Sequence, residues 1–119
     1  SKVDLEALCR ALGVNRVKVV DPYDLAAVET VLKEELAAEE PSVIISRRPC
    51  VMIKGIRHNP PLKIENEKCK GCKSCMKIGC PAIAFNKETK KASIDSTLCV
   101  GCNVCKQLCS FDAITGGAE

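Results

Sequence analysis

Apolar residues in the first part of the chain recur at the three- and four-residue spacing of amphipathic helices. The stretch 3–13 places three leucines on one helical face, and Gly13 is expected to end that helix. The stretch 21–41 repeats the spacing, with Asp21 or Asp24 as the cap and Pro41 as the residue expected to close the helix. The apolar positions of the two predicted helices are Leu5, Leu8 and Leu12, then Leu25, Val28, Leu32 and Leu36.

Two β-branched runs alternate with these helices. RVKVV at 16–20 reads as a short strand, and SVIIS at 42–46 suits a strand covered on both faces. The order helix, strand, helix, strand predicts a parallel pair with a right-handed crossover. Two such strands leave a sheet edge and an apolar face uncovered, so we expect residues 1–60 to be an incomplete α/β segment with a linker. It is either the last piece of a larger α/β domain or a unit that docks on a partner.

The second part of the chain is a repeat. CKGCKSCMKIGCPAIAF, from Cys69, aligns with CVGCNVCKQLCSFDAIT, from Cys99. The first three cysteines of the two copies are 30 positions apart (69 to 99), whereas the fourth cysteines are 29 apart (80 to 109). Short apolar runs precede and follow each copy, which predicts strand, cysteine loop, short helix and strand, twice. Residues 61–119 are therefore a second predicted domain, and the fold class of the whole is α+β.

The composition of the chain narrows the kinds of site and partner that it can have. The chain has 119 residues, ten of them cysteine, with 3% aromatic residues and a formal charge of +3. No stretch resembles a membrane span or a leader peptide, so clustered C-x-x-C pairs favour metal ligation in a reducing cytoplasm over disulfides. So few aromatic residues argue against a base-stacking nucleic-acid surface. Cys9 and Cys50 stand apart from the clusters and are expected to be small buried apolar residues.

Two kinds of metal site fit the cysteine runs. Zinc requires four tetrahedral ligands, and paired C-x-x-C motifs can supply them, as in an interaction module without redox function. Zinc does not, however, need the third cysteine of each run or the fourth that recurs with it. Iron–sulfur clusters use all of them. Gly71 and Gly101, each directly before the second cysteine of its run, are expected to turn with positive φ and to aim backbone N–H groups at sulfur.

Residues 62–119 resemble the bacterial-type ferredoxins with two [4Fe–4S] clusters. Their run C-x2-C-x2-C-x3-C-P is nearly matched by CKGCKSCMKIGCP, although four residues separate Cys75 from Cys80. The resemblance implies crossed ligation, in which the fourth cysteine of each run serves the opposite cluster. The implied sets are Cys69, Cys72, Cys75 and Cys109 for one cluster, and Cys99, Cys102, Cys105 and Cys80 for the other. Gly79 can absorb the additional residue by a left-handed turn.

Nearly the whole chain is also similar to the alpha (large) subunits of indolepyruvate:ferredoxin oxidoreductases. The similarity is carried by VVDPYDL, PSVIISRRPC, GCPAI and LCVGC. It implies that residues 1–60 end a thiamine-diphosphate-type domain. It also implies that the chain passes electrons from oxidative decarboxylation of an aryl 2-oxoacid to an external ferredoxin. A smaller beta subunit and the rest of the alpha subunit are the other implied partners.

The same resemblance places thiamine diphosphate, Mg²⁺ and coenzyme A in the full enzyme only. The G-D-G…N segment by which such enzymes hold Mg²⁺ and the diphosphate is absent here. We therefore expect no catalytic residue in this chain. A free-standing ferredoxin-like electron carrier is the alternative, and a zinc-stapled module is the third possibility. From Lys63 to Lys91 there are eight lysines and three glutamates. This excess of positive charge is either an ordinary solvated face, a compensation for the negative clusters, or a surface that steers an acidic acceptor.

Overall fold

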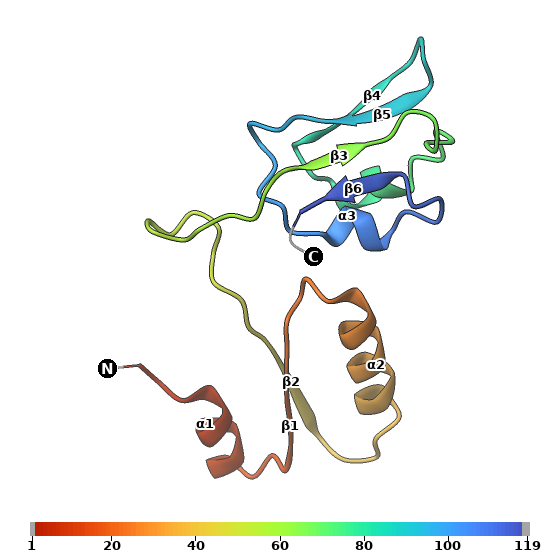
Figure 1. Ribbon diagram of the computed structural model, residues 1–119. Helices are drawn as coiled ribbons and strands as arrows, with labels where there is room; N and C mark the ends of the chain where they lie inside the picture. The colour runs from red at the N-terminus through yellow and green to blue at the C-terminus, as the bar shows by residue number, and fades with distance from the viewer. Residues whose placement is uncertain (1, 118–119) are drawn as a thin grey trace. The chain divides into compact units, whose positions relative to one another are not determined.

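The computed structural model of the protein describes residues 2–117 (Figure 1). It divides into two compact units, Ser1–Cys50 and Val51–Glu119, which are described separately below. The domain boundary that the sequence predicts, between residues 60 and 61, lies within the second unit. The division into domains 1–60 and 61–119 stays a prediction. Helices and strands are mixed in the chain, and no sheet closes on itself, consistent with the α+β class. None of the described helices is long and apolar enough to cross a membrane.

The first unit has the predicted order of elements. Helix α1 (Leu5–Ala11) precedes strand β1 (Arg16–Val20), and helix α2 (Leu25–Leu36) precedes strand β2 (Ser42–Ser46). The two strands pair in parallel, with Arg16 opposite Ser42 and Val20 opposite Ser46, as the alternating order predicted. Asp4 and Asp24 cap the two helices, each accepting a hydrogen bond of 3.0 Å from the backbone N–H three residues on.

Helix α2 ends earlier than predicted. Its last residue is Leu36, with Ala37 as the C-cap, and the helix does not continue to Pro41. Glu39 and Glu40 would lie at the negative end of the helix dipole, which opposes another turn. The residue before a proline also avoids helical φ and ψ values.

The apolar surface of this unit is largely uncovered. Leu5, Leu8 and Leu12 form the predicted face of α1, but they remain 48%, 47% and 76% exposed. Strand β2 is half-buried along most of its length, so the prediction that it is covered on both faces is wrong for this chain. A two-stranded sheet with two short helices has too little mass to cover both of its own faces.

A buried ion pair links α2 to β1. The guanidinium of Arg16 donates two hydrogen bonds of 2.9 Å to the carboxylate of Glu35, whose side chain is 2% exposed. Donation by Arg16 is the main cause that lowers the pKa of Glu35, against the opposing effect of burial. The pair fixes the helix against the strand at the one buried acidic side chain of the described residues.

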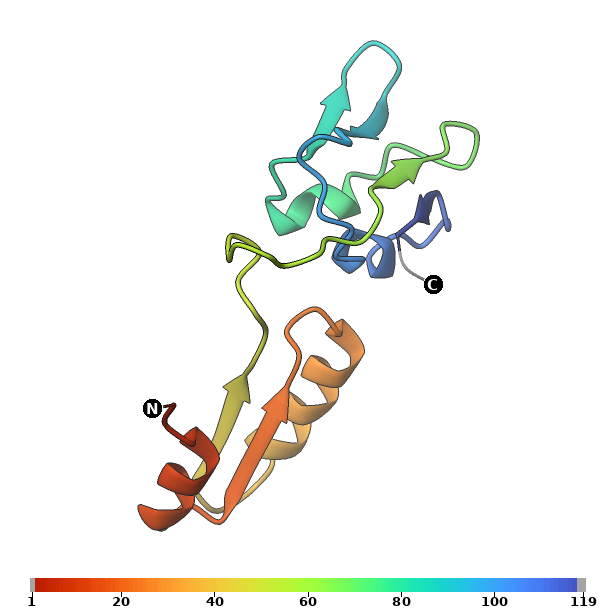
Figure 2. The same cartoon turned by 60° about the vertical axis from the view of Figure 1, so that its left-hand side comes forward.

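The second unit joins its two sequence copies through both of its small sheets. Strand β3 (Leu62–Ile64) pairs antiparallel with β6 (Ile114–Gly116), and β4 (Ile83–Asn86) pairs antiparallel with β5 (Lys91–Ile94). A 3-10 helix, η1 (Ser74–Ile78), follows the first cysteine loop, and α3 (Val104–Gln107) follows the second. The predicted strand, loop, short helix and strand are thus present twice. Figure 2 shows β4 and β5 in cyan, joined by their turn.

Cysteines form part of the core of this unit. The buried cluster contains Leu62, Cys69, Cys75, Ala92, Cys105, Ala113 and Ile114, with Cys99 and Cys109 packed against it. Three of its seven buried members are therefore predicted ligands. Since the other side chains are few and small, the sulfurs occupy the place that large apolar residues hold in an ordinary core.

Candidate metal centre

The first group of sulfurs combines three cysteines from one copy with one from the other. Cys69, Cys72, Cys75 and Cys109 line one pocket, together with Gly71 and Ile64, and this pocket is partly open to solvent. Burial raises the pKa of the Cys75 thiol, and the neighbouring Cys72, Cys109 and Cys69 raise it further. The structure thus brings Cys109 to the loop that contains the first three cysteines.

The expected second group is Cys99, Cys102, Cys105 and Cys80. Burial raises the pKa of the Cys105 thiol to about 11, and Cys102, Cys99, Cys80 and Cys75 add to the shift. Of these, Cys80 and Cys75 belong to the first copy. A thiol with so high a pKa keeps its proton at neutral pH unless a cation takes the place of that proton.

Backbone N–H groups point at several of these sulfurs. The N–H of Leu62 donates to Cys99 Sγ, and the N–H of Ala113 donates to Cys109 Sγ, each at 3.4 Å. Hydrogen bonding with the backbone and then with the hydroxyl of Ser74 is the main cause that lowers the pKa of the Cys72 thiol. Such donors stabilise negative charge on sulfur, which suits thiolate ligands whose metal centre gains an electron.

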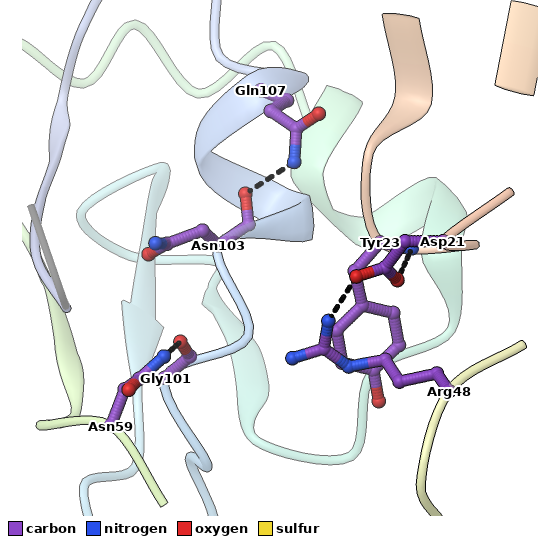
Figure 3. Close-up of polar contacts among 7 residues, drawn as sticks. All are labelled: Asp21, Tyr23, Arg48, Asn59, Gly101, Asn103 and Gln107. Carbon is purple, nitrogen blue, oxygen red and sulfur yellow. Dashed lines mark hydrogen bonds and ion pairs between the residues drawn. The ribbon is translucent and has the colours of Figure 1, made fainter. Parts of the chain in front are cut away.

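The two cysteine loops turn at equivalent glycines. Gly71 and Gly101 have φ of +68° and +64°, as predicted from their place before the second cysteine. A Cβ at Gly101 would lie 2.5 Å from the carbonyl oxygen of Pro60 and 2.7 Å from Cβ of Asn59. The side-chain amide of Asn59 donates to the Gly101 carbonyl at 3.2 Å (Figure 3). The second loop therefore lies directly against the segment before β3.

Gly79 accommodates the additional residue of the first run. It is the C-cap of η1 with φ of +66°, and its N–H donates to the carbonyl of Met76 at 3.0 Å. This is the left-handed turn that the sequence predicted between the short helix and Cys80.

Sequence reasoning missed several residues that shape the loops. Lys73 and Asn103, directly before the short helices, both have φ of +62° although neither is glycine. Asparagine tolerates this conformation, so Asn103 carried a usable signal, whereas lysine gives none. The carbonyl of Asn103 also accepts a bond of 3.2 Å from the Gln107 amide (Figure 3). Lys91 donates to the carbonyl of Cys69, a contact that no sequence pattern indicated.

The two remaining cysteines lie outside both groups. Cys50 is exposed and Cys9 is only half-buried, so the prediction that both are small buried apolar residues is wrong for Cys50. The chain leaves β2 at this point, and Arg48 there pairs with Asp21 and lies 4.0 Å from the centre of the Tyr23 ring (Figure 3). This polar contact lies just after the end of β2 and does not cover Cys50 with apolar side chains.

The donor set fits a polynuclear centre held by thiolates. Eight cysteines in two runs, with backbone donors and apolar surroundings, match the ligand requirement of two [4Fe–4S] clusters. Among residues 2–117, no group of three histidine, cysteine or acidic side chains is arranged to hold a single metal ion. The fit to clusters rests on the number of these cysteines, on the pocket that four of them line and on their apolar surroundings.

Comparison with known proteins agrees with this fit. Residues 61–113 match the family model of the 4Fe-4S dicluster domain. The chain is 41% identical to the indolepyruvate oxidoreductase subunit IorA of Thermococcus kodakarensis over 94% of this chain, and 40% identical to that of Pyrococcus horikoshii over the same share. It spans only 18% of the length of these relatives. A dihydromethanopterin reductase (acceptor) of Methanosarcina mazei is 37% identical over 48% of the chain. Two [4Fe–4S] clusters are the cofactors that these matches and the cysteine sets support.

Proposed function

We propose, from the homology of this chain over 94% of its length to the C-terminal region of subunits named IorA, that it is the electron-transfer part of an indolepyruvate:ferredoxin oxidoreductase. The observation that carries the proposal is that Cys109 of the second run lines one pocket with Cys69, Cys72 and Cys75 of the first run, which supports crossed ligation. The similarity to IorA also covers the first unit, which a free-standing ferredoxin carrier does not require.

Each proposed cluster takes three thiolates from one run and one from the other. Cys69, Cys72, Cys75 and Cys109 hold the first cluster, and Cys99, Cys102, Cys105 and Cys80 hold the second. A bound cluster takes up and releases single electrons. The protein itself supplies the N–H groups of Leu62 and Ala113, which orient and stabilise the thiolates, and a core that keeps Cys75 and Cys105 from water.

The remaining steps of the reaction belong to other parts of the enzyme. Thiamine diphosphate, Mg²⁺, coenzyme A and the aryl 2-oxoacid bind outside this chain. The rest of the large subunit and a smaller beta subunit supply their sites. Electrons leave to an external ferredoxin in the cytoplasm. The first unit, with its linker to about residue 60, ends the thiamine-diphosphate-type domain, and residues 61–119 form the bacterial-type ferredoxin domain.

Metal and sulfide analysis tests the proposal. Anaerobically purified protein should contain about eight iron atoms and about eight acid-labile sulfides per chain, because each cubane contributes four of each. After reduction with dithionite, low-temperature electron paramagnetic resonance should show two interacting reduced clusters. Zinc without sulfide would contradict the proposal and favour an interaction module.

A further inference from the structure

The two cysteine loops of the second unit differ in charge although their backbones are alike. The first loop, from Cys69 to Cys80, carries Lys70, Lys73 and Lys77 and no acidic residue. The second loop, from Cys99 to Cys109, carries a single lysine, Lys106. Both loops turn at a glycine and continue into a short helix, so the difference lies in the side chains.

Lysines from the neighbouring β4–β5 turn add to the charge around the first loop. The backbone of Lys90 lies directly against Gly71, and Lys91 donates to the carbonyl of Cys69. Nζ of Lys73 lies 4.5 Å from the centre of the Phe85 ring on β4. The equivalent neighbours of the second loop are Asn59 and Pro60, which are uncharged.

These charges are accessible, and so is the centre that they surround. Lys70, Lys73, Lys77 and Lys90 are all exposed. Within the described residues of this unit, an ion pair joins Lys68 to Glu65, and no ion pair of residues 2–117 engages those four lysines. Of the eight proposed ligands, all within the described range, Cys72 of the first loop is the exposed one. Electron transfer between proteins requires close approach, which an exposed ligand permits.

We infer that the first loop is the docking surface for an acidic redox protein, and that electrons leave the chain from the cluster of Cys69, Cys72, Cys75 and Cys109. The inference rests on the proposed function. The docking surface consists of Lys70, Lys73, Lys77 and Lys90 around Cys72. Positive charge near this loop also stabilises an added electron more than the surroundings of the second loop do, which favours flow from the second set toward the first. In the outward step one electron passes to the oxidised iron–sulfur centre of the partner; no bond changes and no proton moves.

A binding measurement on the complete oxidoreductase tests the surface without reference to turnover. The probe is a plant-type ferredoxin, an acidic protein, whose iron is replaced by gallium so that no electron can pass. The variant Lys70→Gln/Lys77→Gln should raise its Kd about three- to tenfold at low ionic strength and flatten the salt dependence. The matched control is Lys106→Gln, because Lys77 and Lys106 both lie in the last turn of the short helix after their loops. It should leave Kd unchanged.

Three results would overturn the inference. The double variant could bind the probe as the unaltered enzyme does, Lys106→Gln could weaken binding equally, or Lys70 and Lys77 could resist acetylation in the assembled enzyme. The last result would mean that another part of the oxidoreductase covers the loop. Iron and sulfide contents of the same preparations separate this inference from the proposed function. If both clusters are present and probe binding is unaltered, the docking surface alone is rejected. If iron and sulfide are missing, the proposed function is rejected.

Discussion

Replacing Gly101 by alanine should destabilise the cluster-binding unit far more than the same change at Gly79. The two glycines have nearly equal φ, +64° and +66°, so the conformational cost of a Cβ is the same for both, about 1–2 kcal/mol. Alanine also restricts the unfolded chain, which returns about 0.4–1 kcal/mol in each case. The net cost of Gly79→Ala is therefore on the order of 1 kcal/mol, because its Cβ would meet nothing within 4 Å.

Gly101→Ala carries two further costs. Its Cβ would lie 2.5 Å from the Pro60 carbonyl oxygen and 2.7 Å from both Cβ and the carbonyl oxygen of Asn59, so the segment before β3 must move. Such overpacking costs about 1–3 kcal/mol. The movement also breaks the hydrogen bond from the Asn59 amide to the Gly101 carbonyl, worth about 0.5–1.5 kcal/mol. The excess over Gly79→Ala is thus roughly 2–4 kcal/mol.

Thermal loss of cluster absorbance, followed anaerobically at one scan rate, measures the difference. For a unit of this size, the excess should lower the midpoint of Gly101→Ala by on the order of 10 °C or more below that of Gly79→Ala. One scan rate is essential, because loss of clusters is irreversible. Equal midpoints for the two variants would refute the reasoning that contact between the loop and residues 59–60 holds the second cluster site.

Further outcomes follow from the other features. The double variant Cys80→Ser/Cys99→Ala should retain about four iron atoms per chain, because crossed ligation assigns both cysteines to one cluster. The double variant Cys80→Ser/Cys69→Ala should damage both clusters. The reverse iron contents would reject crossed ligation. Removal of iron with a chelator should abolish the chemical-shift dispersion of residues 62–117, because the sulfurs form much of the core, and a native-like spectrum of the iron-free protein would contradict this. The hydrogen bonds from Arg16 hold the pKa of Glu35 below the ordinary value of a glutamate, so its contribution to stability should be fully present above that ordinary value and be lost as pH falls through the folded pKa. Amide signals of residues 16–36 during acid titration should show this loss, and Glu35→Gln should remove that part of the pH dependence.

Local patterns predicted the secondary structure well because they act over a few residues. The strands at 16–20 and 42–46 have the predicted bounds, and Gly71, Gly79 and Gly101 turn as their places in the runs required. Periodicity also located the leucine face of α1, but it could not tell what covers that face. Burial depends on neighbours distant in sequence, which is why the exposure of Cys50 differed from expectation.

The sequence predicts the candidate ligands, and the pocket that Cys109 shares with Cys69, Cys72 and Cys75 agrees with one of the two implied sets. The place of Cys80 in the other set stays a prediction from the family resemblance. The surroundings of the site were less predictable. The positive φ of Lys73 and the bond from Lys91 to the Cys69 carbonyl could not be predicted, because lysine has no preference for either role. Both features depend on the packing of β4 and β5 against the first loop.

Both sheets of the second unit join one copy of the repeat to the other, since β3 and β4 belong to the first copy and β5 and β6 to the second. A single copy consequently has no partner strand of its own, and it could form these ladders only by pairing with a second molecule, as in domain swapping. For the ribosome-bound chain the same arrangement means that the β3–β6 ladder cannot form until residues 114–116 have been synthesised.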